Sequence, residues 1–195
     1  MRRGIYSCID FCLWQDEVSD ALLNRRAWVV QERLLSPRTL HFGSNQLLWE
    51  CYVPAACESF PGRIPAKVLS YDVKQCFPLE PNPEKEHLEL SDDGKILFSS
   101  SWADLVSVYT TGNLSHEKGK LVAISSLAER FKELYQDEYL AGLWKWNFVH
   151  YLLWEALPEG TFGRSFTRRP SKYRASSWSW ASIDGDIIPW DPRCS

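Results

Sequence analysis

The chain has 195 residues, of which 45% are hydrophobic and 24% are charged, and its 22 basic and 25 acidic residues give a formal net charge of −3. This balance excludes a strong whole-chain attraction to nucleic acid or to an anionic membrane, and no apolar run reaches the roughly 18 residues of a membrane span. The 10 Trp residues stand against a single Met, which indicates an aromatic core, an aromatic binding surface, or both.

The six cysteines do not have the spacing of a metal site. Cys8 and Cys12 are separated by three residues, and Cys51 and Cys57 by five, without the C-x2-C pairs of a zinc module. The N-terminus has no small-residue cleavage site after its short apolar run, so we expect no signal peptide. The sequence therefore predicts a cytoplasmic protein with reduced thiols and no metal.

The first half of the chain predicts one helix and one hairpin. A helix is expected over residues 17–36, because apolar residues recur at helical spacing on one face: Leu23, Ala27, Val30 and Leu34. Pro37 then ends the helix. Residues 39–43 and 46–51 have the character of two short strands, and the turn-forming segment Gly43-Ser44-Asn45 joins them.

A stretch rich in proline and charge, from about residue 54 to residue 95, shows no apolar period and predicts a long, mostly exposed connection. Three helical patterns follow. The first is capped by Ser101 and ends at Gly112, the second runs from Leu121 to Leu134, and the third covers residues 143–153. Residues 159–174 form a basic loop, and residues 177–183 alternate as a strand with Trp178 and Trp180 on one face. The fold class is α+β.

A dense motif runs through the first helix and the hairpin. It comprises, in order, Arg26, Trp28, Gln31, Glu32, Leu35, Ser36, Arg38, Phe42 and the segment Trp49-Glu50-Cys51. This pattern resembles the C-terminal part of the fungal heterokaryon-incompatibility (HET) domain, whose core reads R-x-W-x-x-Q-E-x-x-L-S-x-R and continues to W-E-C. The tail segment Ser177-Trp178-Ser179-Trp180 resembles the region that follows this domain in many fungal relatives.

The resemblance implies three parts: residues 1–61 as the C-terminal fragment of a HET domain, residues 62–95 as a connection, and residues 96–195 as a mainly helical region after the domain. The HET domain has been argued to be a remote relative of the TIR-like α/β fold. The family's N-terminal half, with its S-Y-x-W-G strand, has no counterpart in this sequence. We therefore expect a truncated domain.

The function that the resemblance implies is vegetative incompatibility and programmed cell-death signalling in fungal non-self recognition. On a helix, Trp28 and Glu32 are i and i+4, so the carboxylate lies beside the indole, where an aromatic setting of low dielectric raises a carboxyl pKa. The same spacing resembles the W-x-x-x-E element of Toll/interleukin-receptor (TIR) domains, whose glutamate supports NAD cleavage. By this resemblance Glu32 is the catalytic residue, Trp28 shapes its pocket, and NAD is the substrate in intact relatives, with no further cofactor.

The residues also leave other interpretations open. Glu32 next to Arg33 is equally typical of a plain ion-pair network. The chain as a whole is alternatively a non-catalytic module that recognises a protein partner or assembles with itself through an aromatic surface, or it is a non-functional remnant. The basic loop is either a solvated surface or a site for phosphate or an acidic partner, through Arg164, Arg168, Arg169, Lys172 and Arg174.

Overall fold

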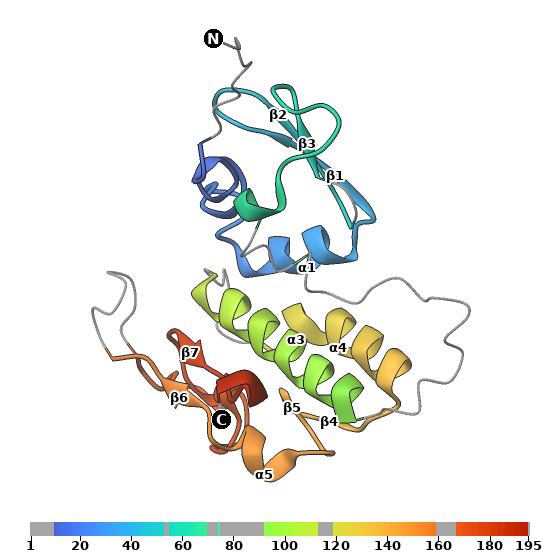
Figure 1. Cartoon of the computed structure of the whole chain (residues 1–195). Helices are drawn as coiled ribbons and strands as arrows, with labels where there is room; N and C mark the ends of the chain where they lie inside the picture. Colours follow the sequence, from blue (N-terminus) through green and yellow to red (C-terminus); the bar gives the residue numbers. More distant parts are fainter. Residues whose placement is uncertain are drawn as a thin grey trace, which may run out of the picture.

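The computed structural model describes residues 10–52, 55–69, 74, 92–112, 119–158 and 167–194. The expectations for residues 1–9, for most of the connection between 70 and 91, and for Arg164 lie outside these residues. Helices and short strands are mixed along the described chain, which makes it an α+β structure (Figure 1). No described helix combines the length and the apolar character that a membrane crossing requires.

The single helix expected over residues 17–36 is wrong. The chain instead forms a π-helix, η1 (Gln15–Ser19), then a series of turns, and then the α-helix α1 (Ala27–Leu35). The side-chain amide of Asn24 donates to the Val18 carbonyl at 2.6 Å. In a continuous helix, the backbone N–H of residue 22 would donate to that carbonyl. The predicted end is confirmed: Ser36 is extended, at φ −75° and ψ 122°, as the following Pro37 requires.

The predicted hairpin is confirmed. Strands β1 (Arg38–Phe42) and β2 (Leu47–Cys51) pair antiparallel, and β3 (Ala56–Cys57) adds a short third strand in the order β1-β2-β3. Leu40 lies opposite Trp49, and Phe42 lies opposite Leu47. Because side chains alternate along a strand, Leu48 and Glu50 point from β2 to the buried side.

The described residues form two hydrophobic cores. The smaller core lies under the hairpin and contains Trp14, Val18, Leu48, Ala55, Cys57, Ile64, Val68 and Leu69. The last three come from the 3₁₀ turn η2 (Ala66–Val68) and from the residues on either side of it. The larger core lies between α1, α3 (Asp92–Thr111) and α4 (Val122–Tyr135), with α1 packed against both other helices (Figure 1). Both ends of the expected connection therefore contribute to folded structure, since Ile64, Val68 and Leu69 are buried at one end and α3 begins within the other.

Helix α3 begins nine residues before the predicted cap, so Ser101 lies inside the helix and is buried. The buried serines of this helix serve tertiary contacts: Tyr151 donates to the Ser99 hydroxyl at 2.9 Å, and Ser100 donates to Asp191 at 3.1 Å. The predicted apolar face is confirmed, because its members are all buried: Trp102, Leu105, Val106 and Tyr109. Helix α4 likewise confirms the stripe expected from residue 121 to residue 134.

The helix expected over residues 143–153 and the strand expected over residues 177–183 are both wrong. Residues 139–156 form the hairpin β4 (Tyr139–Leu140) and β5 (Leu143–Trp144), then the single turn α5 (Phe148–Tyr151) and the strand β6 (Glu155–Ala156). Ala141 at φ 46° and Gly142 at φ 103° make the tight turn that a helix would not allow. The tail forms η5 (Trp180–Ser182), β7 (Ile187–Ile188), which pairs with β6, and η6 (Pro192–Cys194).

The Gly142 turn fixes the aromatic centre of the larger core. The indole nitrogens of Trp102 and Trp180 both donate to the Gly142 carbonyl, at 3.0 and 2.8 Å. Trp102 and Trp144 meet edge to face with their centroids 5.2 Å apart. Trp178, in contrast, is 38% exposed. The tryptophans of the chain therefore serve mainly as core, with a minority on the surface.

Candidate functional site

The two residues expected to form a catalytic pair lie on α1 in different surroundings. Glu32 is exposed to solvent. Trp28 is half-buried and packs against the larger core, and a Cβ at Gly119 would lie 3.6 Å from Trp28 Cζ2, so the ring faces the start of α4. The Glu32 carboxylate therefore lies in solvent and not in the low-dielectric setting that we expected. Its catalytic role stays a prediction.

The buried carboxylate of this region is Glu50, in the centre of the Trp49-Glu50-Cys51 segment. Its side chain has no solvent exposure. Arg33, from α1, donates through Nε to both carboxylate oxygens at 2.9 Å and through Nη2 to Oε1 at 2.6 Å. Such forked contacts are the strongest kind of charged hydrogen bond. They join the helix to the second strand of the hairpin.

Two further side chains complete this Glu50 cluster, which we define as Glu50, Arg33, His41 and Lys74. His41 Nε2, from β1, lies 2.9 Å from Glu50 Oε2. Lys74 Nζ lies 3.7 Å from the same oxygen and 3.4 Å from the Thr39 hydroxyl. Four segments that are separate in the sequence therefore meet at one carboxylate.

The cluster keeps Glu50 ionised. Burial alone would raise its pKa, but hydrogen bonds from His41 and Arg33, with the charges of Arg33 and Lys74, lower the pKa from 4.5 to about 2. A carboxyl group with this pKa holds no proton near neutral pH, so it does not suit general acid catalysis. Its chemistry fits a structural hub, because a buried charge is tolerated only when it is paired.

The other motif residues divide between packing and surface. The Gln31 amide donates to the Ser126 hydroxyl at 3.2 Å and so links α1 to α4. Arg26 and Arg38 are exposed, and Ser36 is half-buried. Trp49 is 39% exposed on the outer side of the hairpin, and Cys51 is half-buried at the end of β2, opposite Arg38. The motif therefore does not converge on one pocket.

Sequence reasoning missed Arg33, His41 and Lys74. Two signals were present in the sequence. Arg33 lies three residues after Val30, on the buried side of α1. Glu50 lies two residues after Leu48 in β2, so both side chains point to the buried face of the sheet. A charged residue in each of two buried positions indicates a bridge between them. No local pattern marks Lys74, because its stretch of chain shows no apolar period.

Within the described ranges, no group of three or more His, Cys, Asp or Glu side chains is arranged to hold a metal ion.

The Glu50 cluster holds α1 on the hairpin. Comparison of the chain with protein-family models, with curated proteins and with solved structures gave no match.

Proposed function

We propose that this chain is a HET-type protein of fungal vegetative incompatibility, which acts in cytoplasmic cell-death signalling as a non-catalytic interaction module. The observation that carries the proposal is the Glu50 cluster. It joins the two halves of the motif, because Arg33 lies within the helical half and Glu50 belongs to the W-E-C half. The helix and the hairpin that carry the motif therefore form one folded unit, as we expect if the motif belongs to a single domain.

The surroundings of Trp28 and Glu32 favour contact with a partner over NAD cleavage in this chain. Glu32 is exposed, and the Trp28 ring is used against the start of α4. An exposed carboxylate lacks the solvent-excluded surroundings that strengthen electrostatic catalysis. NAD cleavage stays what the resemblance implies for intact relatives.

The outer side of the hairpin supports the interaction role. We call this surface the hairpin face, and its members are Leu40 at 47%, Phe42 at 81%, Leu47 at 37% and Trp49 at 39% exposure. The strand register places Leu40 beside Trp49 and Phe42 beside Leu47, so the four side chains are contiguous. Contiguous exposed apolar residues are typical of protein contact sites. The partner we propose is a protein with an apolar surface of its own.

Inducible expression of the whole chain in a filamentous fungus tests this proposal. We expect induction to reduce viability, and Phe42→Ser to restore growth, because the substitution removes the most exposed apolar group of the hairpin face. Val149→Ser is the matched control, since Val149 is 74% exposed on α5, away from the hairpin. Normal growth at a verified level of the unaltered chain would contradict the proposal.

A further inference from the structure

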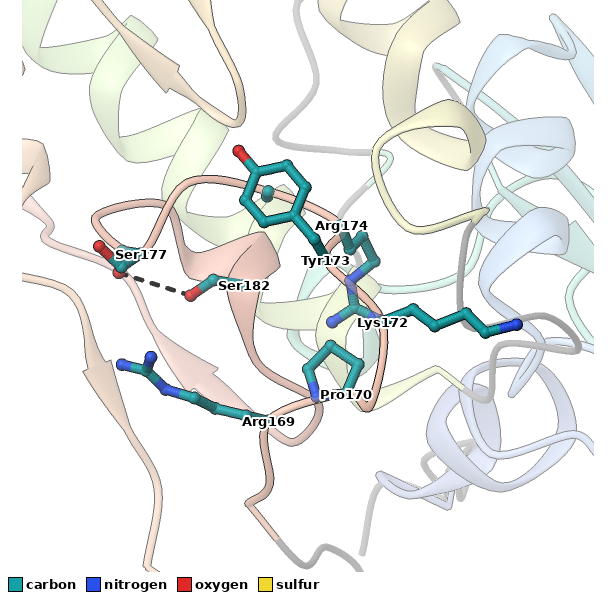
Figure 2. A pocket seen from close by; sticks show the side chains of 8 residues that line it. Arg169, Pro170, Lys172, Tyr173, Arg174, Ser177 and Ser182 are labelled. Atoms are coloured by element: carbon teal, nitrogen blue, oxygen red, sulfur yellow. Dashed lines mark hydrogen bonds between the residues drawn. The ribbon is translucent and has the colours of Figure 1, made fainter.

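A surface hollow lies beside the final segment of the chain, away from the Glu50 cluster. Its volume is about 180 Å³, and the polar and aromatic side chains that line it are Arg169, Lys172, Tyr173, Arg174, Ser177 and Ser182 (Figure 2). The proposed incompatibility function uses none of these residues.

The frame of the hollow is held by Arg174, whose side chain is only 3% exposed. Its guanidinium donates to the Ala181 and Ile183 carbonyls at 2.7 and 2.8 Å, and to Asp184 at 2.7 Å. These bonds fasten the segment around residue 174 to the segment around residue 182. The hollow is therefore formed before any ligand arrives, which lowers the entropic cost of binding.

The local charge is positive. Residues 167–186 carry four basic side chains, Arg168, Arg169, Lys172 and Arg174, against Asp184 and Asp186, while the whole chain is at −3. Arg174 and Arg168 already engage Asp184, at 2.7 and 3.6 Å. Arg169 and Lys172 are exposed, and no described carboxylate lies within ion-pair distance of either. Their charges are thus available to attract an anion.

The Arg169 and Lys172 side chains point in opposite directions, away from each other, with Arg174 between them (Figure 2). Exposed side chains change rotamer within nanoseconds, so either one turns toward an anion that enters between them. Guanidinium and ammonium groups are the usual protein partners of phosphate. The Ser182 hydroxyl is held only by a 3.5 Å contact with the Ser177 carbonyl and is easily redirected.

The rim carries a flat aromatic surface. Tyr173 is 85% exposed, and an exposed ring beside a basic groove is the arrangement on which nucleic-acid bases stack. The hollow is smaller than the roughly 300–1,000 Å³ of pockets that enclose a whole ligand. It therefore has room for the charged end of a ligand, while the planar end stays outside, over the ring.

We propose that this hollow binds a mononucleotide, with the phosphate between Arg169 and Lys172 and the base stacked on Tyr173. The test is calorimetric titration of the full chain with adenosine 5′-monophosphate at low salt. We expect saturable binding that Tyr173→Ala weakens about tenfold, through loss of stacking. The double variant Arg169→Ala/Lys172→Ala should weaken it about tenfold or more, through loss of charged hydrogen bonds.

Three controls make the result decisive. Lys132→Ala removes an exposed lysine from α4, outside the hollow, and should leave the affinity unchanged. Adenosine and inorganic phosphate should each bind at least about tenfold more weakly than the nucleotide, because each lacks half of the contacts. Circular dichroism should show the same fold for every variant, since all the substituted side chains are exposed. An absence of saturation at millimolar nucleotide, an equal loss in Lys132→Ala, or equal affinity for inorganic phosphate would overturn the proposal.

Discussion

The Arg33 guanidinium spans both carboxylate oxygens of Glu50, with Nε at 2.9 Å from each, and the pair is nearly sealed from solvent, at 9% and 0% exposure. This contact joins helix α1 to the β1–β2 hairpin. Because α1 also packs on α3 and α4, the pair connects the smaller core to the larger one.

Arg33→Met should lower the free energy of unfolding by about 3 kcal/mol, because removing one partner of a buried pair leaves the other charge without its main contact. The loss lies at the lower end of the usual range, since His41 and Lys74 still face Glu50. Urea denaturation measures it. Arg130→Ala, which breaks an exposed pair with Glu133, should cost less than about 1 kcal/mol. Similar losses in the two variants would contradict the assignment of Glu50 as the hub.

The Glu50 cluster also makes stability depend on acid. The pKa of Glu50 is about 2 in the folded chain, against 4.5 for an ordinary glutamate, so its contribution is complete above about pH 4.5 and is lost as the pH falls toward 2. The difference corresponds to about 3 kcal/mol. Denaturation curves for the unaltered chain and for Glu50→Gln between pH 6 and 2 test it. We expect a smaller slope in the variant, and equal slopes would count against the lowered pKa.

Lys120 should also make stability rise with pH, but on the alkaline side. Burial and the charge of Arg174 lower its pKa from 10.5 to about 7, although Asp184 and Asp186 act to raise it. The unfolded chain keeps the proton to higher pH, so stability should rise as the pH increases from 7 to about 10. Lys120→Met should remove this rise and should not destabilise the chain at pH 7, because Arg174 still donates to the Ile183 carbonyl.

The control for this variant is Lys132→Met, on the exposed side of α4. It should keep the alkaline rise of the unaltered chain. A rise that persists unchanged in Lys120→Met would show that another group causes it.

Gly142→Ala should destabilise the chain by about 2 kcal/mol or more, from backbone strain and a steric clash. The residue has φ 103°, and an added Cβ would lie 2.6 Å from the Trp180 indole nitrogen. Gly62→Ala is the matched control, because nothing lies within 4 Å of its Cβ position. Thermal unfolding compares the two, and a neutral Gly142→Ala would contradict the tight packing of this turn on Trp180.

Local patterns predicted those elements whose local preferences agree with their tertiary surroundings. Alternation and the Gly43 turn gave β1 and β2, the proline at position 37 gave the end of α1, and the stripe through Ile124 and Phe131 gave α4. The failures occurred where tertiary contacts decided the conformation. The apolar segment at residues 143–153 reads as helical, yet the Gly142 turn and its bonds to two indoles hold its start in a hairpin.

The site was predictable only in part, for a related reason. The motif pointed to the region of α1 and the hairpin, and it included Glu50. It did not reveal that Glu50 is buried and Glu32 exposed, because that depends on how the helix is rotated relative to the sheet. The spacing from Val30 places Arg33 on the buried side of α1, but its contact with Glu50 depends on how α1 packs on the hairpin.

We propose that Trp28, Glu32 and Glu50 serve structure and partner contact in this chain rather than NAD cleavage. Nicotinamide release from NAD by the purified chain at high concentration tests it most directly, alongside Glu32→Ala and the exposed-glutamate control Glu129→Ala on α4. We expect no release above a protein-free blank in all three samples. Release by the unaltered chain and by Glu129→Ala, but not by Glu32→Ala, would contradict it.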